Sequence, residues 1–157
     1  MRFLSPPPSR IPLIDIVNKA VSNSRIWMTY IYEMYRFVQI EDWHEVGAAN
    51  EPAFQNSWAN VGGANDETAA FRLQGVNNLH IKGLVSGGTI TDGTVLFTLP
   101  EKYWPEKTLK VASMYVQGSS ENSYQIELQT DGDLVIYGVS GAAPVLSLHA
   151  RVDIRNG

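Results

Sequence analysis

The segment YQIELQTDGDLVIYG, residues 124–138, decides the fold class of this chain. Apolar and polar side chains alternate on both sides of Asp131 and Gly132, which is the side-chain period of a β-strand. An Asp-Gly pair readily adopts the positive φ angles of a tight hairpin turn. The segment therefore predicts two antiparallel strands joined through Asp131 and Gly132.

The same period continues through most of the chain after Asp42, where turn signals separate short runs of β-branched and aromatic residues. The segment PVLSLHARVDI, residues 144–154, alternates apolar residues with a polar face. Eight or nine short antiparallel strands without intervening helices favour a mainly β fold, a jelly-roll-like sandwich of two sheets. The predicted strands are 43–48, 56–61, 69–74, 78–86, 93–99, 108–117, 123–130, 133–139 and 144–154.

Residues 11–40 follow a helical period instead, with no glycine and a single proline, Pro12. Apolar residues recur at alternating steps of three and four, which is the a/d pattern of a helix that buries a seam against partner helices. This pattern predicts an α-helix that forms a coiled-coil stalk. Its seam comprises Ile14, Val17, Val21, Ser24, Met28, Ile31, Tyr35 and Val38.

The apolar face of this helix is broader than a two-stranded seam requires, because a second apolar row lies beside it. A broad face favours three helices, so we expect a homotrimer. The alternative is that Trp27, Tyr30, Tyr32 and Tyr35 pack into the core of their own chain. The neighbouring row comprises Leu13, Ala20, Trp27 and Met34.

Composition sets the domain organisation and excludes some partners. The 157 residues carry a net charge of -4 and no cysteine. They give no electrostatic reason to expect nucleic acid, and no window reaches the ~18 apolar residues of a membrane span. We expect a proline-rich lead at 1–10, an association helix at 11–41 and a β-sandwich head at 42–157.

A defined corner ends one of the predicted strands, in GTVLFTLPEKYWP at residues 93–105. Pro100 has no N–H to donate and therefore stops the strand ladder. We expect Tyr103 and Trp104 to fold back and cap the end of the core. The inward face of the strand is predicted to comprise Val95, Phe97 and Leu99.

Catalytic patterns are poor in this sequence. The three histidines lack metal-ligand spacing, and neither a Gly-x-Ser-x-Gly motif nor a cysteine nucleophile is present. Asp131 with Asp133, and Asp66 with Glu67, are typical of turns and loops, although a carboxylate pair also occurs in glycosidases and calcium sites. We expect no enzyme activity, no cofactor and no metal.

Several segments carry a resemblance to a known family. The residues are Trp58 and the segments AAFRLQG (69–75), LHIKGLVSGG (79–88), GTVLFTLPEKYWP (93–105) and LQTDGDLVIYG (128–138). Over about residues 43–154 the chain resembles the C-terminal head domains of receptor-binding and tail-fibre proteins from phages of Gram-positive bacteria. The resemblance implies a trimeric β-sandwich head on a helical or fibrous stalk. Such proteins usually have a longer N-terminal region, so a shortened chain or a short accessory protein is expected here.

The expected function is adhesion of a phage tail protein, located at the tail tip and acting outside the cell, to cell-wall polysaccharide or another surface glycan. Other tail or baseplate proteins are expected partners. Sugar recognition needs aromatic faces and nearby polar groups. The candidates are Trp43 and His44 at the junction of helix and head, Tyr115, Glu121, Asn122 and Tyr124 around the loop at 117–123, Tyr137, and His149, Arg151 and Asp153.

Other readings remain open from the residues alone. His149, Arg151 and Asp153 could instead form a charged belt between protomers. The whole protein could be a structural baseplate or appendage component that contacts other virion proteins without binding a glycan. A small polysaccharide hydrolase is a third possibility, which the lack of a convincing acid/base pair argues against.

Overall fold

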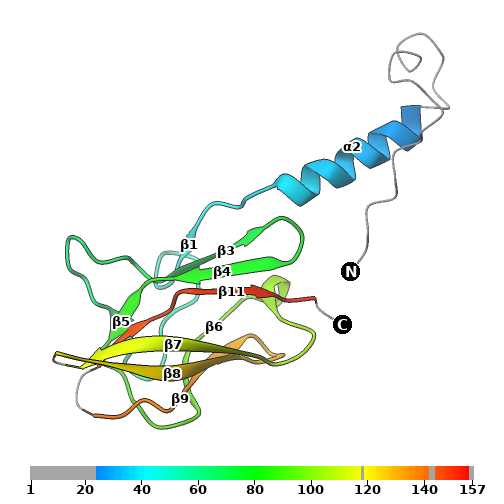
Figure 1. The fold of residues 1–157 in the computed structure, drawn as a ribbon. Helices are drawn as coiled ribbons and strands as arrows, with labels where there is room; N and C mark the ends of the chain where they lie inside the picture. Colours follow the sequence, from blue (N-terminus) through cyan, green and yellow to red (C-terminus); the bar gives the residue numbers. More distant parts are fainter. Residues whose placement is uncertain (1–23, 118, 142–143, 156–157) are drawn as a thin grey trace.

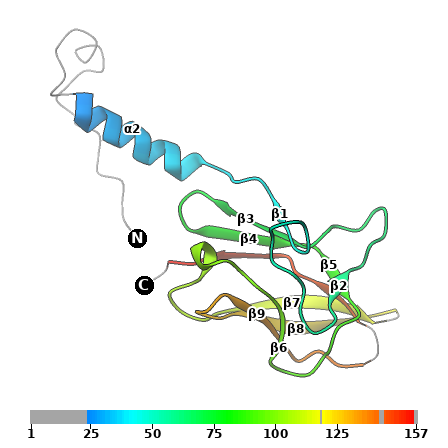
Figure 2. The ribbon, with the colours of Figure 1, turned by 180° about the vertical axis from the view of Figure 1, so that it is seen from behind.

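The computed structural model describes residues 24–117, 119–141 and 144–155. They form a mainly β protein with two antiparallel sheets and one helix, which confirms the predicted fold class at this level. Figures 1 and 2 show the sheets lying one above the other, with the helix projecting away from them. The elements are α2 (Ser24–Val38), β1 (His44–Glu45), β2 (Ala59–Asn60), β3 (Ala70–Gln74), β4 (Asn78–Lys82), β5 (Leu84–Ser86), β6 (Thr94–Thr98), η1 (Glu101–Tyr103), β7 (Leu109–Gln117), β8 (Ser120–Leu128), β9 (Asp133–Tyr137), β10 (Val145–Ser147) and β11 (Ala150–Asp153).

The two sheets enclose one apolar core. The four-stranded sheet has the order β1-β3-β4-β11, and the seven-stranded sheet has the order β2-β5-β10-β7-β8-β9-β6. Residues of both sheets, such as Phe71 and Leu79 from the first and Leu96 and Ile136 from the second, are fully buried between them. The hairpin predicted at 124–138 is present, because β8 and β9 pair antiparallel on either side of Asp131 and Gly132.

Two of the predicted strands are each broken where the chain passes from one sheet to the other. The predicted strand 78–86 divides at Gly83 into β4 and β5, and 144–154 divides at Leu148 and His149 into β10 and β11. Gly83 has a φ of 120°, and a Cβ there would lie 2.4 Å from the Cα atom of Ala69. The two breaks meet, since the Leu148 N–H donates to the Gly83 carbonyl at 2.9 Å. Both strands therefore change sheet at one corner.

The strand before the Pro100 corner also differs from its prediction. The register of β6 against β9 shifts between Val95 and Phe97. As a result Leu96 and Phe97 are both fully buried, whereas Val95 is only half-buried. The alternation that made Val95 an inward residue is therefore wrong at that position, while Phe97 and Leu99 are inward as predicted.

The corner itself folds back as expected, but its two aromatic residues differ. Tyr103, at the end of η1, is buried and caps the core. Trp104 is 39% exposed, and its Nε1–H donates to the Leu99 carbonyl at 2.7 Å. Tyr103 is thus part of the core, whereas Trp104 covers the corner from outside.

Helix α2 is the described part of the predicted association helix, and residues 11–23 lie outside the described residues, as do the predicted seam positions Ile14, Val17 and Val21. The helix stands clear of both sheets (Figure 1), and Tyr32 and Tyr35 are exposed, so they are not part of the core of this chain. Met28 is 64% and Val38 73% exposed. In the single chain, this apolar row therefore faces solvent.

The chain enters the head along the edge of the four-stranded sheet. Residues 39–41, which we call the neck, run antiparallel to β3, with the Gly75 N–H donating to the Gln39 carbonyl (2.6 Å) and the Glu41 N–H to the Leu73 carbonyl (3.0 Å). The predicted strand 43–48 is reduced to β1, two residues paired with β3. No helix in the described part of the chain is long and apolar enough to cross a membrane.

Candidate functional site

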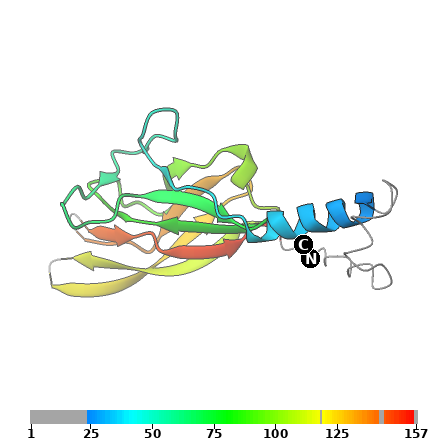
Figure 3. The ribbon, with the colours of Figure 1, turned by 90° about the horizontal axis from the view of Figure 1, so that it is seen from above.

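The outer side of the four-stranded sheet carries most of the polar side chains that the fold brings together. Alternation along β3 and β4 sends Phe71, Leu73, Leu79 and Ile81 into the core, so the intervening residues point outward. Figure 3 looks down on this sheet, with β3 and β4 in green beside β11 in red. We call this surface the basic face and define it by Trp43, Arg72, His80, Lys82 and Arg151.

Trp43 is fixed on the basic face by two cations. The Arg72 Cζ atom lies 4.2 Å and the Lys82 Nζ atom 4.6 Å from the centre of the Trp43 ring. Such contacts are favourable because a cation is attracted to the negative face of an aromatic ring. The result is a half-buried aromatic side chain with two hydrogen-bond donors beside it, outside the apolar core.

A polar network lies at the rim of the basic face. It joins Glu67, from a predicted loop, to the predicted ligand residue His149. The Glu67 carboxylate contacts Lys82 at 3.6 Å and His149 Nε2 at 2.7 Å, and His149 Nδ1 lies 2.9 Å from the Ser147 hydroxyl. The hydrogen bond from His149 has the largest effect and lowers the pKa of Glu67. Desolvation opposes it, and the charge of Lys82 lowers the pKa further. Glu67 is therefore held as a carboxylate between two basic side chains.

The order Ser147, His149, Glu67 has the residue types of a hydrolytic triad, but the surroundings do not supply the rest of such a site. In many serine hydrolases the N–H of the residue after the nucleophile stabilises the oxyanion. Here that N–H belongs to Leu148 and already donates to the Gly83 carbonyl. We therefore interpret this network as one that positions the rim of the basic face.

The predicted ligand residues on β1 and β11 lie at opposite edges of the four-stranded sheet. Arg151 is exposed on the basic face, and Asp153 lies further along β11, where its carboxylate accepts from the Arg155 N–H at 3.1 Å. His44 stacks on Phe71, with ring centres 5.4 Å apart, and contacts the Glu51 carboxylate at 2.8 Å. His44 thus belongs to the packing at the edge of the sheet.

Tyr115 and Tyr124, the predicted ligand candidates beside the loop at 117–123, are not exposed. Both lie on the inward side of β7 and β8 and are buried in the core. Their hydroxyl groups are bonded there, since Tyr124 donates to the Ser147 carbonyl (2.8 Å) and Tyr115 lies 3.1 Å from the Ser140 hydroxyl. Burial also raises the pKa of Tyr124 well above its ordinary range.

The polar loop expected at 117–123 is also much shorter than predicted. Glu121 and Asn122 belong to β8 and pair with Val116 and Tyr115 of β7. Glu121 is exposed on the strand, and Tyr137 is half-buried on β9. These residues therefore lie on the seven-stranded sheet, apart from the basic face.

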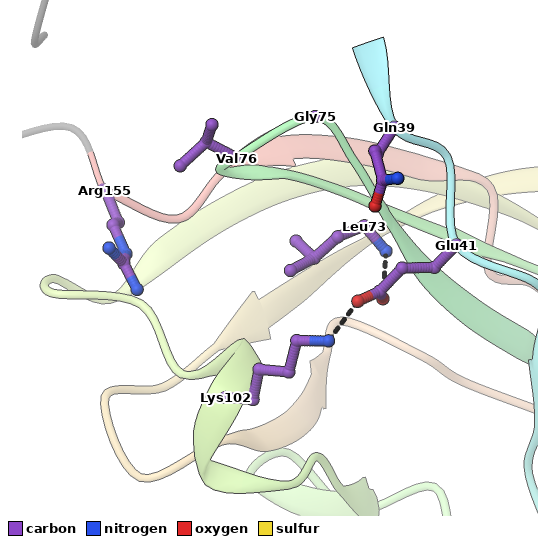
Figure 4. A pocket seen from close by; sticks show the side chains of 7 residues that line it. All are labelled: Gln39, Glu41, Leu73, Gly75, Val76, Lys102 and Arg155. Carbon is purple, nitrogen blue, oxygen red and sulfur yellow. Dashed lines mark hydrogen bonds and ion pairs between the residues drawn. The ribbon is translucent and has the colours of Figure 1, made fainter. Parts of the chain in front are cut away.

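A cavity of about 200 Å³ at the neck was not indicated by the sequence. Figure 4 shows Glu41 in this cavity between Lys102 and the backbone of Leu73. The Glu41 carboxylate accepts hydrogen bonds from Lys102 Nζ, from the Leu73 N–H (3.0 Å) and from the Tyr103 hydroxyl (3.1 Å). The lining residues are Gln39, Glu41, Leu73, Gly75, Val76, Lys102 and Arg155.

The charge of Glu41 is stabilised by these contacts. Desolvation raises its pKa, but the hydrogen bonds from Lys102, the Leu73 N–H and Tyr103 together outweigh desolvation and leave the pKa lowered. Burial and the neighbouring Glu41 carboxylate raise the pKa of Tyr103, which keeps its hydroxyl protonated as a donor. Because Lys102, the Leu73 N–H and Tyr103 all donate to the Glu41 carboxylate, we interpret the cavity as a joint between neck and head.

Arg72, His80 and Lys82 were not predicted as members of a candidate site. The alternation in AAFRLQG and LHIKG assigns these three residues to the outward phase, so their outward orientation could be predicted from those segments. Their position beside Arg151 could not be predicted from the sequence, because it depends on the pairing of β4 with β11. In the described ranges, no group of three or more histidine or acidic side chains is suited to hold a metal ion.

Comparison with known proteins supports the fold. No protein-family model matches the chain, and no curated protein matches it. Among solved structures, the receptor binding protein (gp15) of Listeria phage PSA is similar, with a TM-score of 0.56 and 14% sequence identity. The similarity covers 90% of this chain and 86% of that one. At this level of identity, the likeness shows a shared fold.

Proposed function

We propose that this protein is a receptor-binding head of a phage tail, which acts as a homotrimer and attaches the virion to a glycan on the host cell surface. The observation that carries this proposal is the likeness in fold to the receptor binding protein of Listeria phage PSA, which extends over 90% of the chain. The segments that resemble phage receptor-binding heads lie within the two sheets. A place at the tail tip, among other tail proteins, follows from the same proposal.

The helix supports the trimeric part of the proposal. Met28, Ile31, Tyr35 and Val38 occupy successive seam positions of α2, and all four are exposed in the single chain. An exposed apolar row of this kind is buried when identical helices pack along it. Three copies would also present three equal binding surfaces, which increases the strength of attachment without a new contact.

The basic face supports the adhesive part of the proposal. Trp43 offers an aromatic surface of the kind that packs on the apolar side of a sugar ring, and Arg72 and Lys82 place donors beside it. His149, Arg151 and Asp153 lie on β11 or directly before it, on the same side of the sheet. Four of the ten residues predicted from the sequence thus gather on or beside one surface.

The test is binding of host cell-wall fragments and of neutral oligosaccharides by the full chain, followed by intrinsic fluorescence and calorimetry. We expect Trp43→Ala to lose at least tenfold in affinity, because it removes the aromatic surface. Trp104→Ala is the matched control, since it removes another partly exposed tryptophan, which packs on the turn at Gly132 instead of the basic face. A trimer that binds no glycan at any concentration would instead favour a structural component of the baseplate.

A further inference from the structure

Three basic side chains lie next to one another across the middle of the basic face. Arg72 of β3 and Arg151 of β11 are the direct cross-strand partners of His80 on β4. All three belong to the outward phase, because Leu79, Ile81 and Ala150 point into the core. Neighbouring strands lie about 4.8 Å apart, so the three side chains form one short row. We call it the basic row.

No carboxylate neutralises the basic row within the described residues. The ion pairs there involve His44, Lys82, Lys102, Lys110 and His149, and none involves Arg72 or Arg151. Asp153, the acidic residue two positions after Arg151, is engaged by the Arg155 N–H.

One polar atom of the row is buried without a hydrogen-bond partner. The Nε atom of Arg72 is shielded from solvent and has no hydrogen-bond partner in the described part of the protein. His80 is only 5% exposed, and no hydrogen bond to its ring is found among the described residues. Most buried polar groups are hydrogen-bonded, so such groups call for an explanation.

The electrostatic effect of this arrangement is visible on His80 itself. Desolvation lowers the pKa of His80, and the positive charges of Arg151 and Arg72 lower it further. Like charges that face each other across strands are destabilising. The two arginines therefore disfavour the charged form of His80 in the free protein, and a bound anion would oppose this effect.

We propose that Arg72, His80 and Arg151 form an oxyanion site that takes a phosphate or carboxylate group of a ligand, with Trp43 and Lys82 beside it. A guanidinium group presents paired N–H donors that match the oxygens of either group. Contact with the Trp43 ring orients Arg72. His80 lies between the two arginines and supplies one or two further donors according to its protonation.

This inference rests on the proposed function and deepens it, because it names the chemical class of the ligand on the same face. A surface built only for neutral sugars has no need of three basic side chains in register. An acidic ligand explains both the missing counter-charge and the buried Nε atom of Arg72, which has no hydrogen-bond partner in the described residues.

The test uses the full chain, with inorganic phosphate, acetate and a neutral monosaccharide as separate probes. Binding is followed by calorimetry and by the NMR signals of the His80 ring. We expect phosphate or acetate to saturate the site, and Arg151→Gln to weaken this binding by about tenfold, as loss of a charge-assisted hydrogen bond implies. Lys107→Gln is the matched control, because it removes the charge of an exposed lysine outside the basic face. The relative affinity for the two anions identifies the group.

A second readout does not depend on affinity. A bound anion favours the protonated form of His80, so saturation with the anion is expected to raise the pKa of His80 in an NMR titration. The ionisable groups on its side of the sheet are Arg72 on β3, Lys82 on β4 and Arg151 and Asp153 on β11, with Glu67 and His149 at the rim. Parallel titration in Arg151→Gln separates the anion from these neighbours.

Several outcomes would overturn the proposal. Equal weakening by Arg151→Gln and Lys107→Gln would show a general effect of charge, and dissociation of the oligomer by Arg151→Gln would show that the row pairs with a neighbouring protomer. Binding of neutral oligosaccharide without phosphate or acetate would keep the proposed adhesion and reject the oxyanion site. Anion binding without glycan binding would keep the oxyanion site and reject the proposed adhesion to a glycan.

Discussion

Glu41 joins the neck to the head of this molecule. Its carboxylate accepts hydrogen bonds from Lys102 and Tyr103 of η1 and from the Leu73 N–H of β3, and Tyr103 also caps the core. The side chain is about three-quarters buried, with 25% of its surface exposed. A hydrogen-bonded carboxylate in such a place ties the stability of the junction to its ionisation.

We therefore predict a pH dependence of stability that Glu41→Gln removes. The folded state lowers the pKa of Glu41 from its ordinary value of 4.5, so its contribution is complete above that pH and is lost as the pH falls through the lower, folded value. We expect wild type to lose about 1 kcal/mol more than Glu41→Gln between pH 5 and pH 3, as measured by urea unfolding. Glu101→Gln, which removes an exposed carboxylate from η1, controls for the change in net charge. Parallel curves for wild type and Glu41→Gln would contradict this prediction.

Gly132 shows how one residue fixes the contact between two turns. It has a φ of 85°, and a Cβ there would lie 2.1 Å from Trp104 Nε1 and 2.7 Å from the Leu99 carbonyl oxygen. Trp104 thus packs directly on the turn of the hairpin that sequence analysis identified first. The position needs glycine both for its backbone conformation and for space.

These two requirements can be separated with a matched pair of substitutions. Gly138 has a similar φ of 76°, but a Cβ atom there would meet no atom of the described residues within 4 Å. We expect Gly138→Ala to cost about 1 kcal/mol of unfolding free energy for the backbone, and Gly132→Ala about 3 kcal/mol, because Trp104 must also move. Urea unfolding monitored by tryptophan fluorescence measures both. Equal costs would mean that Trp104 yields without loss.

At the scale of elements, helix α2 is the part for which we propose a role in association. Its apolar row has no counterpart in the two sheets, as its projection away from them shows (Figure 1). The helix has 15 residues in the described part of the chain, and isolated helices of about this length are marginal in water. We therefore expect its order to depend on association.

Ile31→Asp tests this expectation. Near a shared axis the substitution would bring three carboxylates together, so we predict dissociation of the trimer to monomers in sedimentation equilibrium. Thr29→Asp adds the same charge on the opposite side of the helix and is predicted to leave the mass unchanged. A mass that is monomeric for wild type at every concentration, or unaffected by Ile31→Asp, would remove the seam from the proposal.

The elements also show what the sequence can and cannot predict. The hairpin at 124–138 and the phases of β3 and β4 were predicted because alternation is local, whereas the register shift in β6 made the phase of Val95 wrong. The breaks at Gly83 and Leu148 were not, because the buried alternation of Leu79, Ile81 and Val85 runs through the change of sheet. The side-chain alternation of a strand does not change where the strand exchanges one pairing partner for another. The same limit hid the basic row, whose members are brought together by the order β3-β4-β11.

At the scale of the whole molecule, adhesion and association are predicted to be separable. In Ile31→Asp, each head retains its basic face but acts alone. We predict that this variant binds a soluble oligosaccharide with the affinity of wild type and attaches to whole host cells at least a hundredfold more weakly, since avidity is lost. Calorimetry and a cell pull-down measure the two quantities. Loss of both together would mean that the ligand site spans two protomers.

The corner at which β4 continues into β5 and β10 into β11 has a mechanical consequence. Two neighbouring segments of the chain pass there from one sheet to the other, and the Leu148 N–H of one donates to the Gly83 carbonyl of the other. The two sheets are therefore joined by two covalent connections that lie side by side. The sandwich is not free to hinge open at that edge when the helix is pulled. We expect a load applied through the helix to be borne by the two sheets together, and hydrogen exchange in the four crossing strands to proceed through a single opening event.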